Sequence, residues 1–91
     1  MIAPVWRVEF DRAAVRDLRK LGPDGERRVL RYLRERIAGS DDPRSLGHAL
    51  TGDRKGLWRY RVGDYRIVAA IEDDRHVVLV ATVGHRREVY R

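Results

Sequence analysis

Residues 57–72 read LWRYRVGDYRIVAAIE, and this stretch decides the fold. Apolar side chains alternate with arginines or other residues on both sides of Gly63-Asp64, a pattern typical of half-buried β-strands. Gly-Asp is a recognised two-residue hairpin turn. The sequence therefore predicts two antiparallel strands, at 57–62 and 65–72, joined at Gly63 and Asp64.

Like charges meet across this hairpin. Because side chains alternate along a strand, Arg59 and Arg61 point to the same face. A two-residue turn then places Arg61 directly opposite Arg66, on that same face, which we call the arginine face. Opposed like charges destabilise a sheet, so we expect the three arginines to face outward, into a groove that receives an anion. For any one of them, a surface ion pair with Asp64, Glu72 or an acid of a loop is the alternative.

The other face of the hairpin is apolar and predicts the core. Its side chains are Trp58, Tyr60, Val62, Tyr65, Ile67 and Ile71. Alternating apolar positions predict two more strands, one at 5–10 and one at 77–83, the latter after a turn around Asp73 and Asp74. The hairpin therefore belongs to a larger sheet.

Two helices are predicted between the first strand and the hairpin. Asp11 suits an N-cap, and apolar residues then recur at helical spacing up to Gly22-Pro23, which stops a helix. Asp24 can cap a second helix, which Gly39 ends. The apolar positions of the two helices are Ala14, Val15, Leu18, Leu21, Val29, Leu30, Leu33 and Ile37. The helices therefore form an α-hairpin that can back the sheet.

Arginines also line the outer side of the second helix. Arg27, Arg31 and Arg34 are spaced i, i+4 and i+7, so they stand in one row. A solvated face and a nucleic-acid contact are both compatible with such a row.

The predicted fold is α+β with the element order β-α-α-β-β-β, a small, mostly antiparallel sheet packed on an α-hairpin. Residues 39–56 carry turn formers and are expected to form one long loop, which is either functional or only the crossing from helix to sheet. Residues 1–91 are expected to form a single domain, because a second core could not be filled.

The charge balance favours an anionic partner. The chain has 20 Lys and Arg against 14 Asp and Glu, a formal net charge of +6, and such an excess is typical of proteins that bind a polyanion. An arginine bias inherited from a GC-rich genome is the alternative. The sequence lacks cysteines, a secretory signal and an apolar run of about 18 residues, which favours a soluble cytoplasmic protein with no membrane contact. Three scattered histidines, without cysteine or a carboxylate triad, predict no metal site.

The C-terminal segment adds basic and titratable groups. We expect Gly84 to break the last strand and to let the tail turn over the sheet, which would bring Arg86 and Tyr90 near the arginine face. His85 is a further titratable group there. A packing role for Tyr90 and plain surface exposure of His85 are the alternatives.

Residues 56–68, GLWRYRVGDYRIV, and residues 83–90, VGHRREVY, resemble the RelE branch of the RelE/ParE toxin superfamily, whose fold is microbial-RNase-like. Residues 49–52, ALTG, and the opening strand and helix pair also fit. The resemblance implies the toxin of a type II toxin–antitoxin system, an endoribonuclease that cleaves mRNA in the ribosomal A site without a metal or another cofactor and so inhibits translation. Attack by a ribose 2′-hydroxyl on its own phosphate would leave a 2′,3′-cyclic phosphate and a free 5′-hydroxyl.

The resemblance also assigns roles to residues. The expected catalytic residues are Arg61, Arg66, Arg86, Tyr90 and His85. The expected RNA-binding residues are Arg59, Arg54, Lys55 and Arg87. Fixed guanidiniums can stabilise the charge of a phosphoryl transition state, and a base splayed from the strand can stack on an aromatic ring. Arginine replaces lysines common in the family at two of these positions and is a poor base, so proton transfer falls to His85, Tyr90 or His48, with the first two preferred.

Two other functions remain open on the same residues. One is a ParE-like inhibitor of DNA gyrase, and the other is an inactive toxin that acts only as a co-repressor with its antitoxin. The expected partners are a cognate RelB-like antitoxin, whose acidic and apolar segment wraps the sheet face and the helices, and the ribosome with its mRNA and rRNA.

Overall fold

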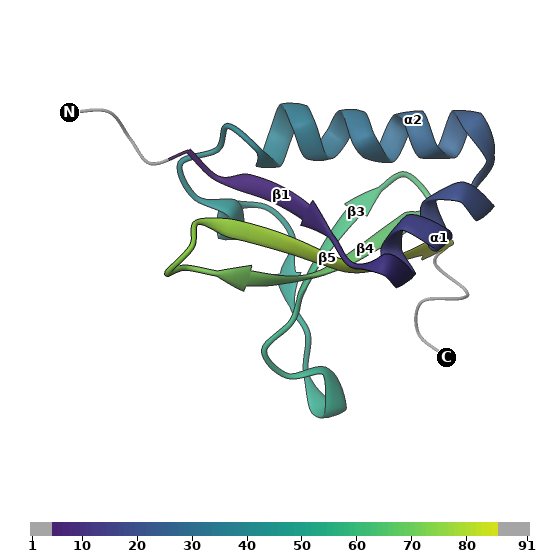
Figure 1. The fold of residues 1–91 in the computed structure, drawn as a ribbon. Helices are drawn as coiled ribbons and strands as arrows, with labels where there is room; N and C mark the ends of the chain where they lie inside the picture. Colours follow the sequence, from purple (N-terminus) through teal and green to yellow (C-terminus); the bar gives the residue numbers. More distant parts are fainter. Residues whose placement is uncertain (1–4, 86–91) are drawn as a thin grey trace.

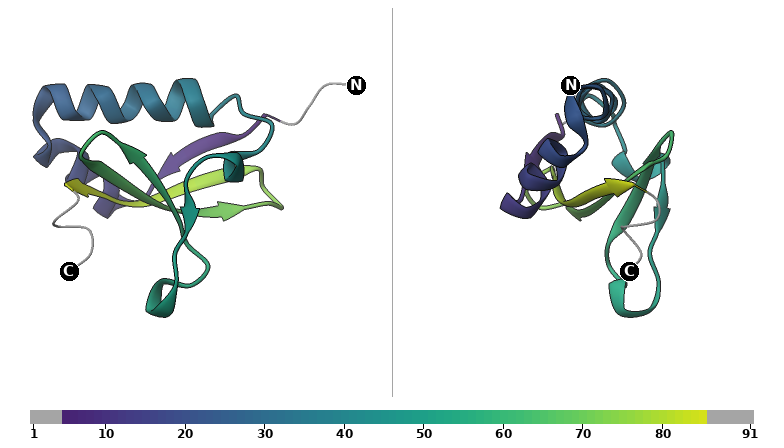
Figure 2. Two further views of the ribbon diagram at one scale, coloured as in Figure 1. Left: turned by 180° about the vertical axis from the view of Figure 1, so that it is seen from behind. Right: turned by 90° about the vertical axis from the view of Figure 1, so that its right-hand side faces the viewer.

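The computed structural model describes residues 5–85 of the chain. This part holds two α-helices, α1 (Arg12–Lys20) and α2 (Gly22–Tyr32), and a turn of π-helix that extends α2 through Leu33–Ile37. Its strands are β1 (Arg7–Phe10), β2 (His48–Ala49), β3 (Trp58–Val62), β4 (Tyr65–Glu72) and β5 (Val77–His85). The two helices pack on the same side of the sheet (Figure 1; Figure 2), which confirms the predicted α+β class.

The five strands form one mixed sheet in the order β1-β5-β4-β3-β2. β1 runs parallel to β5, and the other pairs are antiparallel. The β4–β5 pairing shifts register between Val68 and Ala69. The sequence predicted four of these strands and missed β2, because a strand of two residues has no readable alternation.

The helix starts were predicted unequally well. The Asp11 carboxylate accepts a hydrogen bond from the Ala13 amide at 3.1 Å, which confirms it as the N-cap of α1. Asp24 as the cap of the second helix is wrong, because α2 already begins at Gly22. Gly22 takes φ +83, so the chain reverses between the helices without a separate linker. Asp24 instead lies 3.6 Å from Arg27 inside the first turn of α2.

The core lies between the helices and one face of the sheet. Val15, one of the apolar positions of α1, stays 36% exposed, whereas its neighbour Ala14 is fully buried. The core cluster consists of Trp6, Ala14, Leu18, Val29, Leu33, Ile37, Tyr60, Ile67, Ala69, Val78, Val80 and Val83. The predicted apolar face of the β3–β4 hairpin is therefore the face that the helices cover.

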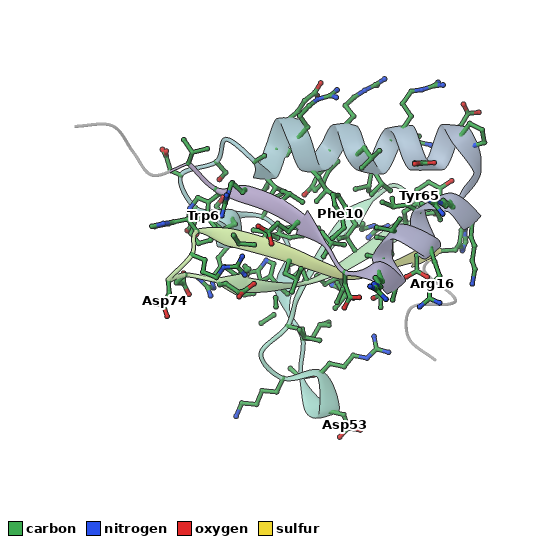
Figure 3. The ribbon with its side chains drawn as sticks, in the orientation of Figure 1. Trp6, Phe10, Arg16, Asp53, Tyr65 and Asp74 are labelled. Atoms are coloured by element: carbon green, nitrogen blue, oxygen red, sulfur yellow. The ribbon has the colours of Figure 1, made fainter. Side chains whose placement is uncertain are left out.

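Residues 39–56 are not one irregular loop as predicted. They contain β2 and two short 3-10 turns, Pro43–Ser45 and Gly52–Arg54. The indole of Trp58 donates to the Leu46 carbonyl, and the hydroxyl of Tyr60 donates to the Pro43 carbonyl, both at 2.6 Å. These two hydrogen bonds hold the first half of the segment against β3, and a local sequence pattern cannot predict them. Its second half projects from the body, and Asp53 marks the tip in Figure 3.

The strand ends also differ from the prediction. β1 starts at Arg7 and β3 at Trp58, so both are slightly shorter than expected, and β5 runs on to His85. The expectation that Gly84 breaks the last strand is wrong. Gly84 is buried and pairs with Arg66 of β4, and a residue without a side chain can sit opposite a large arginine at little steric cost.

Candidate functional site

The β3–β4 hairpin places Arg61 directly opposite Arg66, as predicted. Gly63 and Asp64 alone lie between the paired ends of the two strands. Gly63 has φ +58, while Asp64 is not among the residues with positive φ, which matches a type II′ turn with glycine first. The turn therefore fixes the register that brings the two arginines together.

A second row of the sheet adds a histidine to the arginine face. His48 of β2 pairs with Arg59 of β3. Arg59 pairs in turn with Val68 of β4, and Val68 pairs with Thr82 of β5. Residues paired directly across an antiparallel sheet share a face, so the exposed imidazole of His48 stands beside Arg59. The sequence named His48 as a proton-transfer candidate, but only the unpredicted strand β2 places it.

Arg66 is nearly buried, with 8% of its surface exposed, so the expectation of three outward-facing arginines is wrong for this one. Its Nη1 donates to the carbonyl oxygens of Gly63 and Tyr65, each at 3.2 Å. The exposed Arg61 donates from Nε to the same Gly63 oxygen at 3.5 Å. The negative ends of these carbonyl dipoles offset part of the repulsion between the two arginines.

Carboxylates of the described residues do not offset the repulsion between Arg61 and Arg66 through ion pairs. No acid of residues 5–85 forms an ion pair with Arg61 or Arg66. Glu72, one of the acids considered, lies 3.2 Å from Arg75 instead. For these two arginines the ion-pair alternative is therefore wrong within the described part of the chain.

A further arginine reaches the turn from α2. The side chain of Arg28 is exposed and lies over Gly63, since a Cβ on that glycine would stand 3.4 Å from Nη2 of Arg28. The close approach of α2 depends on Gly25, where a Cβ would come within 2.8 Å of the Tyr65 hydroxyl. Figure 3 shows Tyr65 beside α2. No sequence pattern singles out Arg28, because its neighbours depend on the packing of α2 on the hairpin.

The assembled groups suit phosphate. Guanidiniums form charge-assisted, often bidentate hydrogen bonds with phosphate oxygens, and an imidazole can move a proton near neutral pH. In residues 5–85, no three His, Cys, Asp or Glu side chains gather in a way that could hold a metal ion. The same residues contain no helix long and apolar enough to cross a membrane.

Comparison with known proteins identifies the family of the chain. Residues 8–90 match the family model described as "ParE toxin of type II toxin-antitoxin system, parDE". The chain belongs to the RelE/ParE toxin family. The toxin is 34% identical over 88 residues to Toxin RelG and to Toxin RelE of Mycobacterium tuberculosis. Both matches cover 94% of this chain, and they cover 97% and 87% of the two relatives.

The fold of the toxin matches a solved relative closely. It is similar to the RelBE2 toxin–antitoxin complex of Mycobacterium tuberculosis, with a TM-score of 0.83 and 28% sequence identity. The match covers 92% of this chain and 94% of that chain. The sheet and helix pair described above are thus the architecture of the RelE toxins.

His85 of the toxin does not join the arginine face. It pairs across β4 and β5 with Tyr65, whose side chain belongs to the helix-covered face. The two rings stand edge to face with their centroids 6.3 Å apart. Of the two histidines considered for proton transfer, His48 is therefore the one that the structure brings to the arginines.

The predicted RNA-binding residues do not lie together. Arg59 lies within the arginine face, whereas Arg54 and Lys55 belong to the projecting segment that leads into the start of β3. Both precede the first residue of β3, whereas Arg61 and Arg66 lie at its other end, beside the β3–β4 turn. These two groups could contact a bound strand only at a distance from the Arg61–Arg66 pair.

Three predicted site residues, Arg86, Arg87 and Tyr90, lie outside the described residues. The arginine row on α2 is described and is exposed at Arg27, Arg31 and Arg34. In this row Arg27 faces Asp24 at 3.6 Å. The row belongs to the exposed side of a helix that covers the opposite face of the sheet, so the row and the arginine face are separate surfaces.

Proposed function

We propose that this toxin is a ribosome-dependent endoribonuclease that cleaves mRNA in the ribosomal A site. The observation that supports it best is the arginine face, where His48, Arg59, Arg61 and Arg66 stand on adjoining positions of three strands. Relatives of 34% identity are named RelE and RelG toxins, which agrees with the same branch of the family.

The proposed reaction needs charge stabilisation and two proton transfers. The ribose 2′-oxygen attacks the adjacent phosphorus and loses its proton, while the bond from phosphorus to the 5′-oxygen breaks and that oxygen gains a proton. The products are a 2′,3′-cyclic phosphate and a free 5′-hydroxyl. No metal enters these steps, because guanidiniums can stabilise the negative charge that develops on the phosphate oxygens.

The proposed phosphate contact of each arginine depends on how deeply that arginine is buried. The Nη1 of Arg66 donates hydrogen bonds to the carbonyl oxygens of the turn, which hold the guanidinium in place. Its Nε and Nη2 would then bind the phosphate from a fixed position. Arg61 and Arg59 would bind further phosphate oxygens from the sheet surface. A preorganised donor stabilises a transition state without a cost of reorientation at the moment of reaction, which favours Arg66 as the strongest contributor.

Proton transfer is assigned to His48 as the base. Arginine retains its proton at neutral pH, whereas a neutral imidazole accepts one. His48 stands beside Arg59, while the ring of His85 lies against Tyr65 on the other face. Tyr90, a candidate for proton transfer, is proposed as the donor to the leaving 5′-oxygen or as the stacking partner of a base, and Arg86 is proposed as a further phosphate ligand.

The test is primer extension on a reporter mRNA translated in vitro, with ribosomes present or absent. We expect cuts within codons that require ribosomes and that disappear when the cognate antitoxin is added. Arg61→Ala, Arg66→Ala and His48→Gln should each lower the cleavage rate at least tenfold, since loss of one transition-state donor or of the general base costs more than about 1.4 kcal/mol. Arg34→Ala, on the outer side of α2, is the matched control and should cleave normally.

Full cleavage by the Arg61→Ala, Arg66→Ala double variant would contradict the nuclease proposal. The second candidate is a gyrase inhibitor, favoured by the ParE description of the matching family model. Intact mRNA together with accumulated gyrase–DNA cleavage complexes would establish that candidate instead. Growth without arrest on expression would point to the inactive co-repressor.

The proposed partner is a RelB-like antitoxin. The relative with a TM-score of 0.83 was solved as a toxin–antitoxin complex. A disordered segment that carries acidic and apolar residues could neutralise the arginine face and cover apolar surface at the same time.

A further inference from the structure

Three arginines from three different elements meet at the β3–β4 turn. Arg61 comes from β3 and Arg66 from β4, and both donate to the carbonyl oxygen of Gly63. Arg28 comes from α2, and its Nη2 lies next to Gly63, 3.4 Å from where a Cβ would be. One glycine therefore has three guanidiniums around it.

No ion pair balances this cluster within the described part of the chain. Arg28, Arg61 and Arg66 form no ion pair with an acid of residues 5–85. Asp64, the acid inside the turn, is exposed and does not pair with them there. Carbonyl dipoles carry only partial charges, so the cluster keeps a strong positive potential.

The side chain of Arg28 lies in a different position from that of Arg27, its neighbour on α2. It stands next to Arg27 in the chain, yet its guanidinium reaches over the hairpin turn, whereas Arg27 lies 3.6 Å from Asp24. Arg28 thereby extends the arginine face around the edge of the sheet. A nucleic-acid strand carries one phosphate per nucleotide, so a strand with one phosphate at Arg66 has further phosphates on either side of it.

We propose that Arg28, together with Arg61, forms a second phosphate subsite at the Gly63-Asp64 turn. This subsite binds the backbone phosphate of a nucleotide that flanks the cleaved bond. The inference rests on the proposed function in one respect, namely that RNA lies on the arginine face. The subsite binds the backbone and carries no base preference, since phosphate contacts position a strand without reading its sequence.

Binding of a short single-stranded RNA with 2′-O-methyl riboses, which cannot be cleaved, tests the subsite. The dissociation constant is measured against salt concentration for the wild type, Arg28→Gln, Arg28→Lys and the control Arg34→Gln. One lost phosphate contact on a single strand should make the slope of log K against log salt shallower by about 0.7 in Arg28→Gln. Arg28→Lys should retain most of the slope, because a point charge still binds phosphate, and Arg34→Gln should match the wild type.

A single neutral methylphosphonate linkage, moved along the same RNA, locates the contact. In the wild type, one linkage next to the cleavage position should weaken binding, and in Arg28→Gln the same linkage should cost nothing further. An unchanged slope in Arg28→Gln, an equal loss in Arg34→Gln, or a linkage that costs both proteins the same would overturn the proposal. Weaker binding of an antitoxin peptide by Arg28→Gln with unchanged RNA binding would overturn it as well and assign the cluster to the antitoxin.

These outcomes are separable from those of the cleavage test. RNA binding that depends on Arg28 in a protein that leaves mRNA intact would support the subsite and contradict the nuclease. Normal cleavage together with an RNA affinity that does not change in Arg28→Gln would support the nuclease and contradict the subsite.

Discussion

Arg66 carries a full charge with 8% of its surface exposed, and a buried charge is costly unless its donors are satisfied. The carbonyls of Gly63 and Tyr65 satisfy its Nη1. The same bonds orient the guanidinium, because a fork held at one nitrogen can rotate little at the others. The alternation of side chains predicted an exposed Arg66, whereas the structure shows a nearly buried guanidinium that hydrogen bonds hold in one orientation.

Gly63 is the residue on which this positioning depends. A side chain at φ +58 is strained, so Gly63→Ala should lower the free energy of unfolding by about 1–3 kcal/mol and turn the shared carbonyl away from Arg61 and Arg66. Urea denaturation and the RNA-binding assay measure the two effects. Asp64→Ala, in the same turn without a positive φ, is the control and should change stability by no more than about 0.5 kcal/mol. Equal stability of the two variants would show that the turn does not need glycine.

At the scale of elements, β2 matters more than its two residues suggest. It is an edge strand, and its pairing with β3 places His48 beside Arg59. Gly47 permits that pairing, since it takes φ +78 and a Cβ there would collide with the carbonyl oxygen of Arg59. The tether from Trp58 to the Leu46 carbonyl holds the preceding residue in place.

Gly47→Ala should therefore separate β2 from β3. The expected cost is about 1–3 kcal/mol of stability, from the strained φ and the lost space. Cleavage should fall as far as in His48→Gln, because the imidazole leaves the arginine face. His48→Gln itself should keep wild-type stability, as it changes an exposed side chain. A Gly47→Ala protein that cleaves like the wild type would remove His48 from the mechanism.

At the scale of the whole molecule, the sheet separates a face that the helices cover from the arginine face. The helices and the core cluster occupy one face, and the arginine face is the other. Long-range hydrogen bonds complete the body. The Asp17 carboxylate of α1 accepts from the Val83 amide at 2.9 Å, where β5 extends beyond its pairing with β1. Tyr60 joins the centre of the sheet to Pro43.

Tyr60 predicts how stability depends on pH. Burial, and then the neighbouring Tyr32, raise the pKa of Tyr60 above its ordinary value of 10.0. Below pH 10 the phenol is protonated in both states, so its contribution is fully present. Above pH 10 the unfolded chain ionises first, and stability is lost as the pH rises toward the folded pKa. Burial raises the pKa of Tyr32 in the same direction.

Urea denaturation of wild type and Tyr60→Phe from pH 7 to pH 11 measures this contribution. At pH 7 the variant should be less stable by about 1 kcal/mol, because the Pro43 carbonyl loses its donor. Above pH 10 the variant should lose stability less steeply than the wild type, since only Tyr32 of this pair remains. Parallel curves across the whole range would contradict the assignment to Tyr60.

Local patterns in the sequence were enough to predict part of this structure. Alternation around Gly63-Asp64 predicted the β3–β4 register and the opposition of Arg61 and Arg66, because a two-residue turn permits one pairing only. The apolar stripes predicted both helices and the face that they cover. The motifs of the hairpin and the tail identified the toxin family.

Which functional groups lie next to one another depends on the packing of the whole chain. His48 reaches Arg59 through a strand too short to show a pattern, Arg28 reaches Gly63 through the packing of α2, and His85 pairs with Tyr65 on the core face. The burial of Arg66 likewise depends on its surroundings in the fold and cannot be read from alternation. Contacts between residues far apart in the chain follow from how whole elements pack, and a local sequence pattern carries no information about that packing.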